Sequence, residues 1–129
     1  MTENETPQQL TLLPNDVRIS SVEEVFLNRV ATTLEKNYSR EDYGLTEFTN
    51  DMGMSRMQLH RKLKGVTGYS PGEFIRRFRL ERAKQLLCDS GITISEVAYQ
   101  IGYTNLSNFT RIFKEFTGFT PSEYRSRNS

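Results

Sequence analysis

The feature that most constrains the fold is an internal repeat. The stretches "MSRMQLHRKLKGVTGYSP" at residues 54–71 and "YTNLSNFTRIFKEFTGFTP" at residues 103–121 share one frame. At a spacing of 50 residues the frame aligns Gly68, Ser70 and Pro71 with Gly118, Thr120 and Pro121. At a spacing of 49 it aligns Leu45, Glu47, Phe48, Met52 and Gly53 with Ile94, Glu96, Val97, Ile101 and Gly102. The chain is therefore expected to build one unit of about 30 residues twice.

Apolar spacing predicts a first helix over residues 21–37. The segment "SVEE" forms a capping box in which Ser21 accepts hydrogen bonds from the first free N–H groups and Glu24 reaches back. The expected inward stripe, with one residue every four positions, is Val22, Phe26, Val30 and Leu34. Residues 1–20 hold two prolines and no sustained period, which predicts a flexible linker or lead-in.

Two short helices follow and together predict a helix-turn-helix. The first places an apolar stripe on Leu45, Phe48 and Met52. It should end at Gly53, because glycine suits the left-handed C-terminal cap. Ser55 is predicted to cap the second helix, which should end before Gly65. Two short helices joined at a glycine are typical of the helix-turn-helix motif.

A long helix is predicted over residues 71–87, because "SPGE" puts Ser70 at the N-cap and Pro71 at the first helical position. Its expected inner stripe is Phe74, Ile75, Phe78, Ala83, Leu86 and Leu87. Much of the remaining surface is basic: Arg76, Arg77, Arg79, Arg82 and Lys84. These basic side chains either contact phosphate or form a solvated face.

The second copy repeats the pattern. Residues 93–96 form another capping box, residues 105–116 the second helix of the pair, and "TPSE" at 120–123 starts a short last helix. No stretch alternates with period two for long enough to predict a sheet. We therefore expect an all-α fold of about seven helices, with two helix-turn-helix subdomains joined by a long linker helix. The expected organisation is a lead-in at 1–20, an N-terminal helix and first helix-turn-helix at 21–70, the linker helix at 71–88, and the second helix-turn-helix with a C-terminal helix at 89–129.

Charge and composition restrict the partners. Residues 1–54 hold 4 Lys and Arg against 10 Asp and Glu, whereas residues 55–129 hold 13 against 6, so the basic part suits a polyanion. The chain has no run of 18 apolar residues and no signal peptide, so we expect a cytoplasmic segment without membrane contact, whose parent protein can be membrane-anchored. The one cysteine, Cys88, permits no internal disulfide and is expected to be a small core residue.

The second helix of each pair is the candidate DNA-binding element, because such a helix can lie in the major groove. The candidate DNA-binding residues are Arg56, Met57, Gln58, His60, Arg61, Lys64, Asn105, Leu106, Ser107, Asn108, Thr110, Arg111 and Lys114. Most of them donate or accept hydrogen bonds, as contacts to base edges require. Met57 and Leu106 are apolar, so they either touch thymine methyl groups or pack on neighbouring helices. Two copies can enter successive major-groove segments about 34 Å apart.

Other kinds of site are not expected. His60 is the only histidine and has no Cys or acidic partner at metal spacing, so it is either an exposed polar residue or a base or phosphate contact. No acid, base or nucleophile constellation is present, so we expect neither an enzyme nor a cofactor. Phe109, Phe113 and Phe116 recur at helical spacing and are expected in the core rather than as stacking platforms for single strands.

The segments "IGYTNLSNFTRIFKEFTGFTPSEYR" and "RRFRLERAKQLL" closely resemble the DNA-binding domain of AraC/XylS-type transcription regulators, over about residues 23–125. The opening "LPNDVRISSVEEVFLNRV" further resembles the output module of hybrid two-component sensor regulators of Bacteroidetes. The resemblance implies a bacterial regulator that binds specific double-stranded DNA, an activator that contacts RNA polymerase, and dimerisation through upstream domains. It also implies recognition helices at 55–64 and 105–116. Thr49 stands where the family usually has alanine, which implies slightly weaker packing of the first unit.

One alternative stays open, namely a protein-interaction module that binds a sigma factor or co-regulator without binding DNA. The helix surfaces discriminate between the two functions, because a DNA-binding helix must avoid carboxylates that repel phosphate. Residues 55–64 contain no Asp or Glu, which favours DNA.

Overall fold

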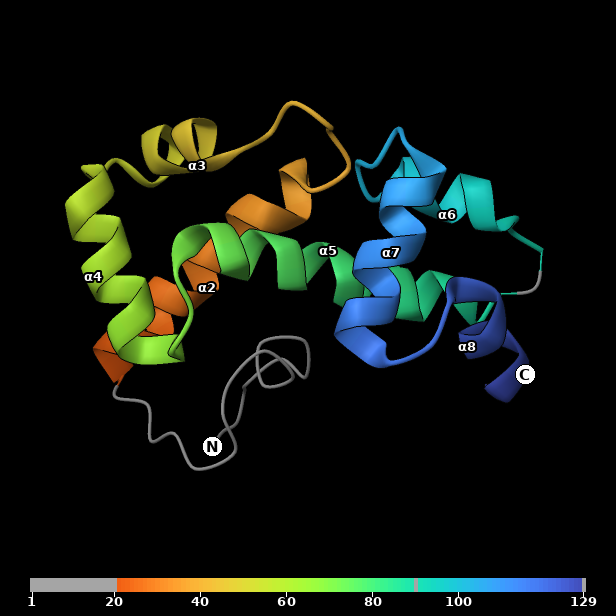
Figure 1. Cartoon of the computed structure of the whole chain (residues 1–129). Helices are drawn as coiled ribbons and strands as arrows, with labels where there is room; N and C mark the ends of the chain where they lie inside the picture. Colours follow the sequence, from red (N-terminus) through yellow and green to blue (C-terminus); the bar gives the residue numbers. More distant parts are fainter. Residues whose placement is uncertain (1–20, 90, 129) are drawn as a thin grey trace. The chain divides into compact units, whose positions relative to one another are not determined.

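The computed structural model describes residues 21–89 and 91–128 (Figure 1). In this part of the chain there are seven helices and no strand, so the predicted all-α fold is confirmed. The helices are α2 (Ser21–Asn37), α3 (Leu45–Met52), α4 (Arg56–Thr67), α5 (Pro71–Leu87), α6 (Ile94–Gln100), α7 (Leu106–Thr117) and α8 (Pro121–Arg127). The lead-in expected at 1–20 lies outside the described residues.

The chain divides into two compact units. Among the described residues, the first unit contains 21–37 and 43–77, and the second contains 38–42 and 78–128. The long helix α5 therefore contributes its first part to one unit and its last part to the other, and the short connection after α2 belongs to the second unit.

In the first unit, α2 packs through a stripe that differs from the predicted one at its start. Its buried residues are Phe26, Leu27, Val30 and Leu34. Val22 was predicted to be part of the stripe but is 70% exposed. The helix already begins at Ser21, so Ser21 and Val22 both lie in its first turn, ahead of the part that packs on the core. The bounds of α2 agree with the helix predicted over residues 21–37, and the capping role of Ser21 stays a prediction.

The helix-turn-helix of the first unit consists of α3 and α4. As predicted, Gly53 ends α3 in the left-handed conformation, with φ of 68°, and Ser55 caps α4. The prediction that α4 ends before Gly65 is wrong, because the helix continues to Thr67 and the left-handed residue is Gly68. Continuation buries Val66 and Thr67, which outweighs the cost of about 1 kcal/mol for a glycine inside a helix.

The C-terminal turn of α4 recurs at the end of α7. In both places a threonine hydroxyl donates to the carbonyl four residues earlier and accepts from the N–H two residues later, at Thr67 and Thr117. The glycine that follows has φ of 85° at Gly68 and 88° at Gly118. An arginine then lies over the next aromatic ring, at 4.3 Å for Arg77 on Tyr69 and 4.5 Å for Arg127 on Phe119. The predicted repeat is therefore present in three dimensions.

The core of the second unit is formed by α5, α6 and α7. It consists of Leu80, Ala83, Leu87, Val97, Ala98, Ile101, Phe109 and Phe113. Phe109 and Phe113 are fully buried, as predicted, whereas Phe116 is only partly buried against the cluster. Leu80 was not predicted, although it is 1% exposed, and Leu86 is only partly buried. The aromatic rings interlock, since Phe113 lies 5.6 Å from Phe109 and meets Tyr124 edge-on at 5.5 Å.

The basic face predicted for α5 is largely used inside the protein. The Arg79 guanidinium donates to the backbone carbonyls of Tyr38, at 3.1 Å, and Arg40, at 2.8 Å, and burial lowers its pKa. Arg77 is half-buried and pairs with Glu73 at 2.9 Å. Arg82 lies 5.3 Å from the centre of the Tyr38 ring. The expectation that Arg79 lies on the outer face is therefore wrong, because carbonyls some 40 residues away in sequence need a donor.

Cys88 is exposed, so its prediction as a core residue is wrong. It follows the last residue of α5, where the apolar stripe has already ended at Leu87, and its thiol lies 3.5 Å from the Lys84 carbonyl. Among the described helices, none has the length and apolar character needed to span a membrane.

Candidate nucleic-acid interface

Helix α4 presents one face to the core and another to solvent. Leu59, Leu63 and Val66 are buried and hold the helix in the first unit. Ser55 fixes its start, because its hydroxyl accepts the Gln58 N–H at 3.1 Å. All six candidate residues of this helix are exposed, namely Arg56, Met57, Gln58, His60, Arg61 and Lys64.

The exposed side chains of α4 differ in how far they are already engaged. Arg56 donates to the Thr46 hydroxyl at 2.7 Å, and the Gln58 side-chain oxygen accepts the Ser55 N–H at 3.0 Å. By contrast, the side chains of His60, Arg61 and Lys64 have no hydrogen bond or ion pair within the described part of the chain. These three side chains are therefore the most available for a ligand on this face.

A cavity of about 570 Å³ lies beside the exposed face of α4. It is lined by Leu45, Arg56, Met57, His60, Arg61, Ser70, Pro71 and Gly72. Met57 is 73% exposed, so it contributes apolar surface to the cavity while the arginines border it. An apolar hollow bordered by guanidinium groups can accept a methyl or sugar group beside a phosphate.

Helix α7 repeats this arrangement in the second unit. Its first residue is Leu106, and Asn105 is its N-cap rather than a helical residue, accepting the Asn108 N–H at 2.8 Å. Asn105, Leu106, Ser107, Arg111 and Lys114 are exposed. Asn108 and Thr110 are half-buried, so their side chains are less accessible than the sequence indicated.

Arg111 is already bound on both sides. One terminal nitrogen donates to the Asn108 side-chain oxygen at 2.7 Å, and the other donates to the Glu115 carboxylate at 3.2 Å. Glu115 was not among the residues predicted for this surface. The signal was present in the sequence, since an acid four residues after an arginine lies next to it on a helix.

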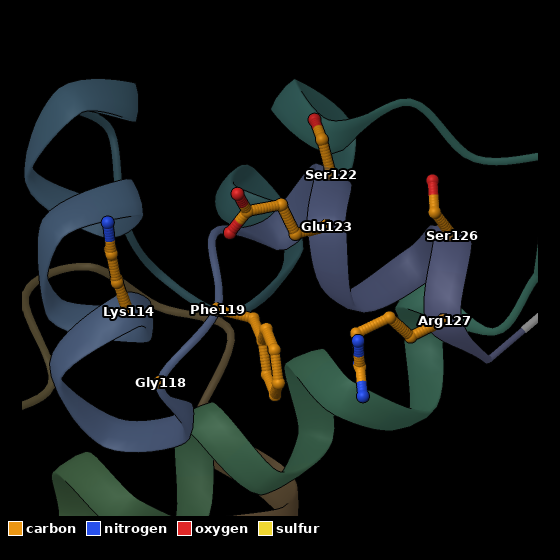
Figure 2. Close-up of a pocket in the computed structure, with 7 residues that line it drawn as sticks. All are labelled: Lys114, Gly118, Phe119, Ser122, Glu123, Ser126 and Arg127. Atoms are coloured by element: carbon orange, nitrogen blue, oxygen red, sulfur yellow. The ribbon is translucent and has the colours of Figure 1, made fainter.

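A second cavity, of about 580 Å³, lies between α7 and α8 (Figure 2). Its lining includes Lys114 and Arg127, and Figure 2 shows the Arg127 side chain beside the Phe119 ring. It also includes Glu123, whose pKa is held below its ordinary value by the Thr120 N–H that donates to its carboxylate at 2.9 Å and by the charges of Lys114 and Arg127. Because this cavity carries both signs of charge, it suits a phosphate less well than the face of α4.

The chain is similar to known proteins over most of its length. A helix-turn-helix domain family matches residues 48–127. Histidine kinase P4 of Formosa agariphila is 36% identical over 118 residues, which are 92% of this chain and 9% of that protein. The DNA-binding domain of AdpA, solved with a target DNA, is 25% identical with a TM-score of 0.70, over 78% of this chain and 88% of that one. A probable AraC family transcriptional regulator from Rhodopseudomonas palustris is 29% identical with a TM-score of 0.63, over 78% of this chain and 94% of that one.

Proposed function

Because the chain belongs to the helix-turn-helix family of AraC-type regulators, we propose that it regulates transcription by binding specific sequences of double-stranded DNA. The observation that carries this proposal is the pair of solvent-facing helices, α4 and α7, each N-capped and each presenting an arginine and a lysine at equivalent positions. The AdpA domain, which has the same fold, was solved in complex with DNA and supports the proposal.

In the proposed mechanism, α4 and α7 each enter a major groove, where some side chains contact bases and others contact phosphate. Arg61 and Arg111 contact base edges, where a guanidinium can donate twice to guanine. Lys64 and Lys114, one turn further along, contact phosphate and fix the register. We expect Met57, which lines the cavity on this face, to touch a thymine methyl group. We expect the two helices to occupy successive major-groove segments about 34 Å apart.

The wider role is an output module of a two-component phosphorelay protein. The similarity to a histidine kinase supports this role, although the chain spans 9% of that protein. We propose that the module acts in the cytoplasm as an activator that contacts RNA polymerase, and that upstream domains bring two copies together.

The test is selection of bound duplexes from a randomised DNA library by the purified 129-residue chain. The expected result is an enriched bipartite motif with its halves about one helical turn apart. Weak, sequence-blind binding by the chain alone would mean that dimerisation through upstream domains is needed. If the binding stays sequence-blind when two copies are joined in an enforced dimer, the chain is instead a protein-interaction module, and DNA recognition is not its function.

Binding to the selected duplex is expected to weaken steeply with salt. Each phosphate neutralised by Lys or Arg releases counterions, so the slope of log affinity against log salt should be about −0.9 per phosphate contact. Fluorescence anisotropy with a labelled duplex at several salt concentrations gives the slope. A flat response would contradict phosphate contact by either helix.

Replacing Arg61 by Ala is expected to cost about 1–3 kcal/mol of binding and to relax preference at one base pair. The reason is that Arg61 is exposed and unengaged on the face of α4. The matched control is Lys62→Ala, which removes the same charge from the next residue, where the ammonium lies 4.8 Å from the Phe26 ring centre. Preference profiles from the library decide the result. Equal weakening on all sequences by both variants would show that Arg61 acts only as a charge.

A further inference from the structure

On the surface of α7 the Arg111 guanidinium is held in one position by two neighbours. Asn108 accepts from one terminal nitrogen at 2.7 Å and Glu115 accepts from the other at 3.2 Å. Asn108 is itself held at the start of the helix, where its N–H donates to the Asn105 side chain at 2.8 Å. Residues three before and four after Arg111 lie on the same helix face, so the three side chains form a continuous line.

The Glu115 carboxylate is not explained by a contribution to folding stability or by a contribution to DNA affinity. The Arg111 and Glu115 side chains are 62% and 59% exposed, and ion pairs as exposed as this contribute little to folding. A negative charge on a helix that meets DNA also opposes the attraction to phosphate. What Glu115 does supply is geometry. Two of the five guanidinium N–H groups are occupied, which leaves three, enough for the two bonds that a guanine accepts through O6 and N7.

The first unit contains the same helix without the two neighbours. Fifty residues before Arg111, Asn108 and Glu115 stand Arg61, Gln58 and Gly65. The Gln58 oxygen is occupied by the Ser55 N–H, and Gly65 has no side chain. Arg61 accordingly has no hydrogen bond or ion pair among the described residues. The molecule thus carries one held and one unheld arginine at equivalent positions.

We propose that Glu115 is a positioning residue that sets the base preference of α7 by holding Arg111 ready for guanine. An arginine that is already held loses less side-chain freedom on binding its best partner, and turning toward the single acceptors of thymine or adenine would break its two contacts. The half-site of α7 is therefore stricter for guanine at one base pair than the half-site of α4 is at the equivalent pair. This inference rests on the proposed DNA-binding function of the same two helices.

The test compares base preferences of five proteins on the same randomised duplex library. Glu115→Ala removes the acceptor, and Glu115→Gln keeps a neutral oxygen at the same place. Gly65→Glu installs the missing acceptor next to Arg61, and Gly65→Ala is its control. Gly65 is helical and an added Cβ has open space around it, so both changes fit the fold. The fifth protein is the unaltered chain.

Guanine preference at one position of the α7 half-site is expected to fall about fivefold in Glu115→Ala, with Glu115→Gln intermediate and the other positions unchanged. In the α4 half-site, Gly65→Glu should raise guanine preference by a similar factor, whereas Gly65→Ala should not change it. A purely structural role of Glu115 would alter affinity for all sequences together and leave the profile alone.

The outcomes separate the inference from the proposed function. If the unaltered chain enriches a bipartite motif and Glu115→Ala gives the same profile, the positioning role is overturned while DNA recognition stands. If the unaltered chain enriches no motif even as an enforced dimer, both fall together. A profile that changes at the α7 position alone supports the inference, and a matching gain in Gly65→Glu establishes it independently.

Discussion

Replacing Phe109 by Ala is expected to lower the unfolding free energy of the second unit by about 3–5 kcal/mol. Phe109 is fully buried in α7, with its ring 5.9 Å from Tyr103 and 5.6 Å from Phe113. Its removal leaves a cavity and loses two aromatic contacts. Domains of this size are stable by only about 5–15 kcal/mol, so the loss is a large fraction of the total.

The measurement is denaturant unfolding followed by circular dichroism, with Leu106→Ala as the matched control. Leu106 lies on the same helix but is 43% exposed, so its truncation should change stability by about 0.5 kcal/mol or less. Because Phe109 anchors α7, its replacement should also weaken DNA binding in proportion to the unfolded fraction. Similar midpoints for the two variants would mean that the cluster around Phe109 can collapse into the space.

The local signals in the sequence were sufficient to predict the helices. Ser55 caps α4 as predicted, and Thr93 and Thr120 cap their helices with the partners expected three residues later. Gly53 and Gly118 take the left-handed conformation that ends a helix. These features depend on residues within one or two turns of each other, which is why a single sequence determines them.

The residues whose positions were predicted wrongly have one thing in common. Their burial or exposure depends on contacts with residues that are distant in the sequence. Periodicity shows that Val22 and Cys88 fall at the ends of apolar stripes, but only packing shows where the covering elements stop. The sequence pattern of α5 does not show that Arg79 turns inward, since the Tyr38 and Arg40 carbonyls that it binds lie about 40 residues away. Gly65 was predicted to end α4, but the helix continues to Thr67, whose side chain is buried.

For the candidate interface, the sequence predicted which side chains are exposed but not which of them are already hydrogen-bonded within the protein. All six candidates on α4 are exposed. They could be predicted because the apolar stripe shows which face of the helix is buried, and the remaining residues form the outer face. The two hydrogen bonds of the Arg111 side chain could not be predicted, because the sequence does not show that the side chains of Asn108 and Glu115 both turn toward it. Asn105 precedes α7 as its N-cap, and its side chain accepts the Asn108 N–H. Its direction is therefore set by this capping bond and not by its position on a helix face.

Replacing Gly102 by Ala is expected to cost the second unit about 2–4 kcal/mol. Part of the cost is conformational, since φ is 93° and an L-residue in this region loses about 1–2 kcal/mol. The rest is steric, because the new Cβ lies 2.9 Å from the Tyr38 carbonyl oxygen and 3.2 Å from that of Arg40. Arg79 holds both carbonyls, so the segment cannot withdraw without breaking those bonds.

Gly53→Ala is the matched control, because Gly53 occupies the equivalent position in the first unit. Its φ is 68°, and an added Cβ meets no atom within 4 Å, so only the conformational cost of about 1–2 kcal/mol should appear. The difference between the two variants in thermal or denaturant unfolding measures the close approach of the Tyr38–Asp42 segment. Equal costs would mean that this segment yields to the methyl group, and that Arg79 does not fix it against the turn that leads into α7.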